Sequence, residues 1–480
     1  MPRTHAVGDE RAPYEHGDAY YQEGDVTVQQ DYNPKKSDMG DYGKPMEADA
    51  VPEDSEPPQQ QSDNRLFSFV NRIVPYGGLA SNCFSLGSVT LGGGIISMAD
   101  SFRTSGITMA FIYLLVVTII TIYSMYLIGM ATKKTKGTLR NFEEMGGGLF
   151  GKGWDYFVGA ILFISCVGTA IGYVSALGTL MTPILKESPH TSDYFKSDNG
   201  NHLVVTIFWA FLLVPVVIPK HINSIRYVSV FGVCMVLYFV VTIVVHSCLN
   251  GLKKGMRGNM AYFTTGNQAI YGISIFIFGY MCQSVVYSVY FEMKPRPSVR
   301  QLTVSSTIAM FVCMVFYIFA GLFGYFDFAD DTKGSILENF NPYEDVYMMV
   351  AYMGMLVKIC AAYAMNMVPI RNFLYHCLRW DLETNPYWKH VLLIVPTSAV
   401  VLVAGLFIPS VNLAFGLVGS ITGGFVGFIF PALFWMYSGD WSLKTVGFWH
   451  WISCYLLIVC GVIAIVFGTI ATVYSSFFDV

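Results

Sequence analysis

Long stretches without a charged residue are the feature that most limits the folds open to this chain. A helix needs about 20 apolar residues to cross the roughly 30 Å of hydrocarbon in a bilayer. Eight uncharged stretches reach that length, a ninth is broken only by Lys358, and one long run divides at Pro409 and Ser410 into two spans. We therefore expect an all-α integral membrane protein with eleven transmembrane helices. The stretches are 73–99, 104–132, 156–185, 199–219, 227–252, 258–291, 301–326, 346–370, 390–439 and 445–478.

The N-terminal segment differs from the rest of the chain. Residues 1–74 hold 15 of the 33 acidic residues and 7 of the 29 basic ones, and PEDSEPPQQQSDN at 52–64 contains no Leu, Ile, Val or aromatic residue. Such a segment cannot bury enough apolar surface to offset the entropy lost when its backbone is ordered. We expect residues 1–70 to be a disordered acidic cytosolic tail and residues 71–480 to be the transmembrane domain.

Basic residues in the loops predict how the chain sits in the membrane. With the tail inside, the cytosolic loops carry 14 Lys and Arg and the outer loops carry 7. Cytoplasmic loops of membrane proteins are enriched in positive charge, so we expect a cytosolic N-terminus and an extracellular C-terminus. The outer cluster of Lys253, Lys254 and Arg257 is the main exception.

Glycines interrupt two of the predicted spans at matching depths. Gly92, Gly93 and Gly94 stand inside the first span, and Gly279 is followed by polar residues in the sixth span at 271–293. Secondary transporters built from two inverted five-helix units commonly break the first helix of each unit beside the substrate. Backbone groups freed at membrane depth need partners, and the carboxylate and ammonium of an amino acid supply them. Tight helix packing at the glycines is the alternative.

The residues around these breaks resemble a known family. LGGGIISMADSF at 91–102 resembles the first-helix signature of the amino acid/auxin permease family of the amino acid-polyamine-cation superfamily. FIFGYMCQSVVYSVYFEMKPRPSVRQLT at 276–303 is similar to that family's sixth helix and following loop. The resemblance covers 70–480 and is strongest to the amino acid permeases of trypanosomatid parasites, the best known of which carries arginine.

This resemblance implies both a fold and an activity. It implies a LeuT-like 5+5 inverted repeat and a plasma-membrane permease that imports an amino acid, L-arginine being favoured, by alternating access. A permease for neutral amino acids or of broad specificity, and a membrane amino acid sensor, remain the alternatives.

At two places the sequence differs from the family's sodium-coupled members, and both differences concern which ion drives transport. Ser88 stands where many of those members have Asn, and 359–368 contains no Ser or Thr. Both departures favour proton coupling, or uptake driven by the membrane potential, over sodium coupling. Lys358 lies within the eighth span, where a charge is costly and indicates function by default. It is interpreted as a fixed cation replacing a coupling ion or as a proton-sensitive group, with snorkelling as the alternative.

The candidate residues fall into two groups, and further contacts are expected from Ser165, Thr169 and Tyr173. The coupling or gating candidates are Lys358 and Glu292, although Glu292 is equally explained as an interfacial partner of Lys294. The candidate substrate-binding residues are Ser88, Gly92, Gly93, Gly94, Ser97, Phe278, Gly279, Tyr280, Gln283 and Ser284.

Motifs for other functions are weak or missing. GGGLFGKG at 146–153 contains G-x-x-x-x-G-K, but Gly153 stands where a phosphate-binding loop needs Ser or Thr. The sequence has no HExxH, GxSxG or CxxC pattern. We therefore expect no catalytic residue, no metal site, no cofactor and no nucleic-acid partner, and the lipid bilayer as surroundings.

Overall fold

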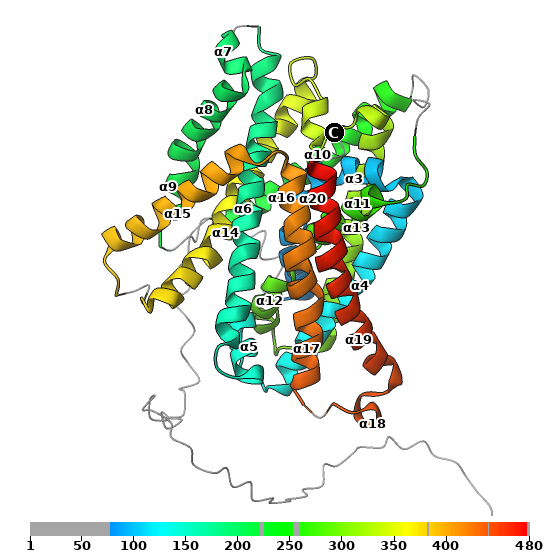
Figure 1. The fold of residues 1–480 in the computed structure, drawn as a ribbon, viewed down its shortest axis with the longest axis vertical. Coiled ribbons are helices and arrows are strands. Elements are labelled where there is room, and N and C mark those ends of the chain that lie inside the picture. The colour runs from blue at the N-terminus through cyan, green and yellow to red at the C-terminus, as the bar shows by residue number, and fades with distance from the viewer. Residues whose placement is uncertain are drawn as a thin grey trace, which may run out of the picture. The chain divides into compact units, whose positions relative to one another are not determined.

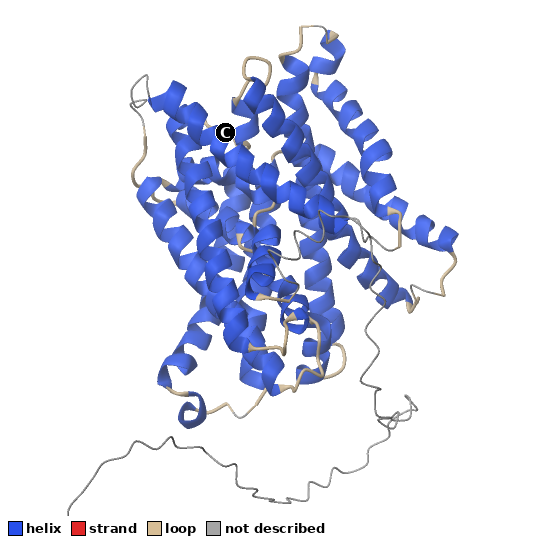
Figure 2. Cartoon of the chain, turned by 180° about the vertical axis from the view of Figure 1, so that it is seen from behind, coloured by secondary structure: helices blue, strands red, loops and turns tan. Residues whose placement is uncertain are grey.

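Helices joined by loops make up the described part of this computed structural model, as Figure 2 shows. The structure describes residues 77–189, 191–220, 225–252, 260–381, 384–439 and 441–477. The predicted tail, residues 1–70, and the basic cluster of Lys253, Lys254 and Arg257 lie outside the described residues.

Ten helical segments of the described chain are long and apolar enough to cross a membrane, and one bent helix pair makes an eleventh span. This count confirms the prediction of eleven transmembrane helices. Helices suit the bilayer because they satisfy their own backbone hydrogen bonds where water is absent. The unbroken spans are α4 (Ile107–Lys134), α6 (Trp154–Lys186), α8, η2 and α9 (Asp198–Val217), α10 with η3 (Ile225–His246 and Ser247–Gly251), α13 with η6 (Val299–Phe328 and Ala329–Asp331), α14 (Val346–Leu378), α15 (Tyr387–Phe407), α16, η8 and α17 (Val411–Tyr437), and α19, η9 and α20 (Phe448–Phe477).

The first span breaks where the glycine triplet predicts. Helix α2 (Leu79–Thr90) ends just before the triplet, a short turn η1 (Gly93–Ser97) follows, and α3 (Met98–Ser105) completes the span. The two parts meet at an angle of 51°. Gly92 has an extended backbone, with φ −95° and ψ −150°, so the helical hydrogen-bond ladder stops here.

The sixth span breaks in the same way. Helix α11 (Asn267–Gly279) ends at its last glycine, and the chain resumes in η5 (Gln283–Val285) and α12 (Val286–Glu292). The hydroxyl of Tyr317, on α13, lies 2.5 Å from the carbonyl oxygen of Thr90 and 2.7 Å from that of Gly279. One buried hydroxyl therefore joins the freed carbonyl ends of both broken helices, as the low-polarity surroundings require.

The tenth span, formed by α16 (Val411–Leu417), η8 (Val418–Ile429) and α17 (Phe430–Tyr437), packs its backbone directly on α11. A Cβ atom added at Gly419 would lie 2.0 Å from the carbonyl oxygen of Ser274 and 2.8 Å from the amide nitrogen of Phe278. Only glycine permits such a close approach, and the central η8 is wound as a π-helix.

Short helices lie in the connections between spans. Figure 1 shows α5 and α18 at one end of the bundle and α7 at the other. The loop between α13 and α14 also contains a short helical turn, η7. Their bounds are α5 (Phe142–Phe150), α7 (Asp193–Lys196), η7 (Ile336–Asn339) and α18 (Leu443–Val446).

Candidate functional site

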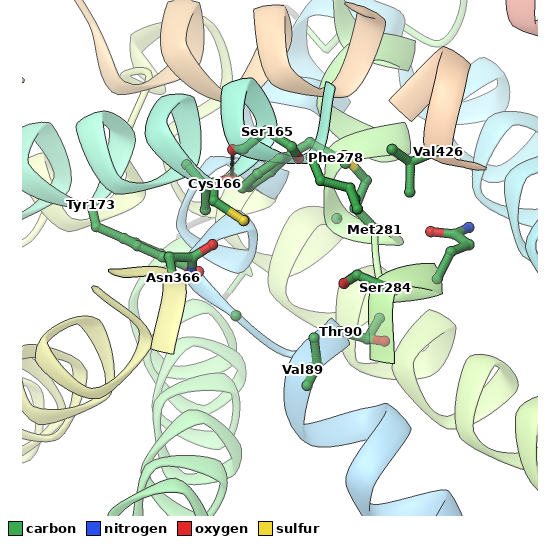
Figure 3. A pocket seen from close by; sticks show the side chains of 17 residues that line it. Val89, Thr90, Ser165, Cys166, Tyr173, Phe278, Met281, Ser284, Asn366 and Val426 are labelled. Atoms are coloured by element: carbon green, nitrogen blue, oxygen red, sulfur yellow. Dashed lines mark hydrogen bonds between the residues drawn. The ribbon is translucent and has the colours of Figure 1, made fainter. Parts of the chain in front are cut away.

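A cavity of about 110 Å³ lies between the two helix breaks (Figure 3). Seven of the ten predicted substrate-binding residues line it, and so do the three further contacts predicted on α6. The remaining lining residues come from α2, α6, α14, η8 and the break in the sixth span. The predicted residues in the lining are Gly92, Gly93, Gly94, Phe278, Gly279, Gln283, Ser284, Ser165, Thr169 and Tyr173, and the others are Val89, Thr90, Leu162, Cys166, Met281, Asn366 and Val426.

Three predicted binding residues lie outside the cavity lining and support the breaks instead. The carbonyl oxygen of Ser88 accepts a hydrogen bond from Lys358. Ser97 is fully buried, and its carbonyl oxygen accepts from Ser101 Oγ at 3.0 Å. The Tyr280 hydroxyl accepts from Thr118 Oγ1 at 2.8 Å. The structure therefore gives these residues a place beside the site rather than in its wall.

Lys358 reaches the end of α2 from α14. Its side chain is buried, with 5% exposure, and Nζ donates to the carbonyl oxygen of Ser88 at 3.0 Å. Gly232 on α10 leaves space for the lysine stem, since a Cβ atom there would lie 2.8 Å from Lys358 Cδ. The buried ammonium therefore lies where α2 loses its helical hydrogen bonds, close to the cavity but outside its lining.

Glu292 is the other coupling or gating candidate. It is the last residue of α12 and is exposed. It does not line the cavity between the breaks. Lys358, by contrast, contacts α2, which contributes to the cavity wall.

One face of α6 forms the wall opposite the glycine triplet. Ser165, Thr169 and Tyr173 are spaced four residues apart and therefore share one helix face. Thr169 Oγ1 donates to the carbonyl oxygen of Ser165 at 2.8 Å. A Cβ atom at Gly93 would lie 2.4 Å from Tyr173 Cε1, so the triplet is in direct contact with this wall.

Two amide side chains add hydrogen-bond acceptors to the hydroxyl groups of the cavity lining. Gln283 is 2% exposed, and its Oε1 atom has no hydrogen-bond partner among the described residues. Asn366 donates through Nδ2 to the carbonyl oxygen of Ala362 at 2.9 Å, which leaves its Oδ1 atom available as an acceptor. No Asp or Glu stands in the described lining. The cavity therefore suits a ligand that brings its own N–H donors.

Asn366 was missed by sequence reasoning, although it is a strongly polar residue in the second half of the eighth span. Its polarity in an otherwise apolar stretch was the available signal. Cys166 and Met281 also line the cavity without having been singled out. Neither residue type carries a sequence signal for substrate binding, because both are common in apolar packing.

An aromatic layer, formed by Tyr173, Phe278 and Phe415, closes one side of the cavity. The rings of Phe278 and Phe415 are stacked, with centroids 4.2 Å apart and planes at 11°. Tyr173 meets Phe415 edge-on at 6.0 Å. Tyr173 and Phe278 line the cavity whereas Phe415, on α16, does not. The layer therefore separates the cavity from the half of the bundle that contains α3 and α16.

A buried carboxylate joins α3 to α16 beyond that layer. Asp100 is 2% exposed, and its Oδ1 atom accepts from Arg103 Nε at 2.9 Å and Nη2 at 2.7 Å. Its Oδ2 atom accepts from Asn412 Nδ2 at 2.6 Å. Hydrogen bonds from a cation and an amide compensate the cost of burying this charge.

Comparison with known proteins agrees with this arrangement. The family described as "Transmembrane amino acid transporter protein" matches residues 78–474. The chain is 23% identical, over 378 residues and 74% of each chain, to sodium-coupled neutral amino acid symporter 2 of Danio rerio.

A solved structure shares the fold. It is Mhp1, a nucleobase-cation-symport-1 family transporter in a closed conformation with bromovinylhydantoin bound. The TM-score is 0.50 at 14% identity, over 82% of this chain and 91% of that one. This likeness confirms the predicted 5+5 transporter fold.

Proposed function

Because the chain belongs to the family of transmembrane amino acid transporters, we propose that it moves its amino acid through the cavity between the two helix breaks. Like its relatives, the protein is a transporter and not an enzyme. The observation that carries the proposed site is that both interrupted spans and α6 meet around one cavity (Figure 3). Alternating access then exposes this cavity to each side of the membrane in turn.

Backbone groups at the breaks hold the main chain of the substrate in this proposal. The first amide groups of η1, at Gly93 and Gly94, have no partner within their own turn. They suit the substrate carboxylate, which the positive end of η1 and α3 also favours. The substrate ammonium faces the carbonyl ends of α2 and α11.

The amide acceptors select the substrate side chain. Gln283 Oε1 and Asn366 Oδ1 favour a side chain with N–H donors, and the guanidinium of L-arginine is the first candidate. A neutral amide such as L-glutamine is the second, because the Danio rerio relative is a neutral amino acid symporter. An aliphatic side chain would leave Gln283 Oε1 buried without a partner, which is costly.

Lys358 supplies the cation at the broken end of α2 in this proposal. Its hydrogen bond to Ser88 places a cation where a mobile coupling ion would otherwise meet a freed carbonyl. We therefore propose uptake coupled to protons or to the membrane potential, without a sodium requirement. The proposal also places the protein in the plasma membrane with a cytosolic N-terminus.

The test is uptake of labelled L-arginine into cells that express the chain, compared with empty-vector cells. Unlabelled arginine, glutamine and leucine serve as competitors, and sodium is replaced by choline in a parallel series. Competition by arginine alone supports the cationic substrate, and competition by glutamine supports the neutral one. Competition by leucine at equal strength contradicts the role given to Gln283. Binding of amino acid without net flux would instead indicate a sensor.

A further inference from the structure

A second cavity, of about 290 Å³, lies beyond the aromatic layer and shares no residue with the first. We name it the Glu338 cavity. The second half of α6, the start of α8, the loop around η7 and the connection between α15 and α16 form its walls. Six of its lining residues carry the argument: Val174, Ser175, Asn201, Ser335, Glu338 and Val411.

Two of these residues place the Glu338 cavity next to the substrate cavity. Val174 directly follows Tyr173, and Val411 lies one helical turn before Phe415. Tyr173 and Phe415 belong to the aromatic layer. The contact of α6 with α16 therefore forms the wall between the two cavities.

Two polar side-chain atoms of the Glu338 cavity have no hydrogen-bond partner among the described residues. Ser335 is fully buried, and its Oγ atom has no hydrogen-bond partner among the described residues. Asn201 donates through Nδ2 to Gly178 O and Thr182 Oγ1, which leaves its buried Oδ1 atom unpaired in the described chain. Two independent side chains thus lack the partner that buried polar groups normally have.

Glu338 adds a negative charge to these acceptors. Burial raises the pKa of its carboxyl group, against the opposing effect of Lys333 and Lys186. Lys333 Nζ donates to the backbone oxygen of Glu338 at 3.3 Å, and neither lysine lies within ion-pair distance of the carboxylate. A partly desolvated carboxylate without a direct partner gains more from a hydrogen-bonded cation than an exposed one does.

This set of groups favours an organic cation over a metal ion. One carboxylate, one amide oxygen and one hydroxyl provide acceptors for the three N–H groups of an ammonium. A divalent metal ion would need more oxygen ligands around a smaller space. Within the described chain no group of three His, Cys, Asp or Glu residues could hold a metal.

We propose that the Glu338 cavity binds the ammonium group of an amino acid before that amino acid passes the aromatic layer into the substrate cavity. This inference rests on the proposed transport function. Glu338 provides the charge-assisted contact, and Asn201 and Ser335 provide neutral acceptors. Removing the Glu338 charge weakens capture from solution but leaves the later steps of transport intact.

The first measurement separates KM from the maximal rate. Uptake of labelled L-arginine and of labelled L-glutamine is recorded for the wild type, Glu338→Gln, Ser335→Ala and the control Asp330→Asn, with surface biotinylation as a check on expression. Asp330 is an exposed carboxylate close to the same loop. We expect Glu338→Gln to raise KM about tenfold, the effect of one charge-assisted hydrogen bond, with an unchanged maximal rate per surface molecule. Ser335→Ala raises KM less, and Asp330→Asn does not raise it.

The second measurement does not depend on transport. Ser175→Cys places a thiol in the Glu338 cavity, and its modification by a membrane-impermeant methanethiosulfonate reagent is timed against the parent chain. Millimolar arginine or glutamine slows this modification, and Glu338→Gln abolishes the protection.

The two measurements distinguish the two proposals. If the wild type transports but Glu338→Gln has the same KM as Asp330→Asn, the proposal that the Glu338 cavity binds the substrate ammonium is overturned. Absence of protection at Ser175→Cys by either amino acid overturns it as well. If an amino acid protects the Ser175→Cys thiol but the wild type shows no uptake, the proposed transport function is contradicted while binding in the Glu338 cavity is supported.

Discussion

The Lys358 ammonium donates a 3.0 Å hydrogen bond to the carbonyl oxygen of Ser88, two residues before the end of α2. A buried cation thus stabilises the carbonyl end of a helix, where the helix dipole favours positive charge. Because α2 forms part of the cavity wall through Val89 and Thr90, this hydrogen bond joins α14 to the cavity between the two breaks.

Replacing Lys358 by Met is expected to reduce uptake at least tenfold. The change removes the cation and leaves a buried carbonyl group without its partner, a loss of about 1.5–3 kcal/mol. Uptake per surface molecule is the measurement, and Lys444→Met, at an exposed lysine, is the control. Replacement of sodium by choline leaves wild-type uptake unchanged. A fully active Lys358→Met variant would contradict the coupling role.

Gly93→Ala is expected to abolish uptake while the protein still reaches the surface. The added Cβ atom would lie 2.4 Å from Tyr173 Cε1 and displace the wall formed by α6. Gly87→Ala is the matched control on α2, since its Cβ atom would have Cys313 Sγ as nearest neighbour at 3.9 Å. Equal activity of the two variants would show that the triplet does not shape the substrate site.

Tyr317→Phe is expected to destabilise the protein by about 1–3 kcal/mol, because the freed carbonyls of Thr90 and Gly279 lose their shared donor. The melting temperature of the purified protein in detergent measures this loss. Tyr113→Phe is the control, since the hydroxyl of Tyr113 has no hydrogen bond among the described residues. An unchanged melting temperature in Tyr317→Phe would mean that the bridge contributes nothing.

Phe415→Ala is expected to open the aromatic layer. Phe278 loses its stacking partner at 4.2 Å, so a membrane-impermeant thiol reagent added outside the cell reaches Cys166, which lines the cavity. Labelling is measured by mass spectrometry of the peptide that contains Cys166, with the Phe415→Ala, Cys166→Ala double variant as control. Wild-type and Phe415→Ala proteins that label equally would show that the layer is not a barrier.

Glu143 is expected to make stability depend on pH. Burial, together with the nearby Glu144 charge, raises the pKa of the Glu143 carboxyl group, opposed by its backbone hydrogen bond and by His376. Below the unfolded value of about 4.3 the group is protonated in both states and adds no penalty. As pH rises through the raised folded pKa, the folded state carries a desolvated charge and loses stability.

The corresponding measurement is a melting temperature recorded from pH 4 to pH 8. Glu143→Gln removes the loss, so its melting temperature at the upper end exceeds that of the wild type by roughly 1–2 °C. Glu187→Gln, at an exposed position, leaves the profile unchanged. A Glu143→Gln profile that parallels the wild type throughout would contradict this prediction.

The spans and the two breaks could be predicted because uncharged length and glycine position are properties of the sequence itself. Side-chain direction beside a break could not. Helical periodicity assigns faces only where the helix continues, and the chain is non-helical between Gly279 and Gln283. For this reason Tyr280 faces Thr118 rather than the cavity, while Gln283 lines the cavity as expected.

The contacts between distant helices were also beyond prediction from one sequence. Phe415 and Tyr317 are ordinary aromatic residues in apolar stretches, and only the packing of α16 and α13 brings them to the breaks. Asp100 lies in the same stretch as the glycines, but its partner Asn412 is more than three hundred residues away. Sequence spacing carries no information about such pairs.

The contact at Gly419 limits how this protein can diversify. A side chain at that position would push η8 off the backbone of α11 at Ser274 and Phe278, and with it one wall of the substrate cavity. A variant with a different cargo is therefore expected to keep this glycine and to change side chains of the cavity such as Gln283 and Asn366. The backbone contact at Gly419 is a fixed constraint on the scaffold, whereas the side chains of the cavity can change without disturbing it.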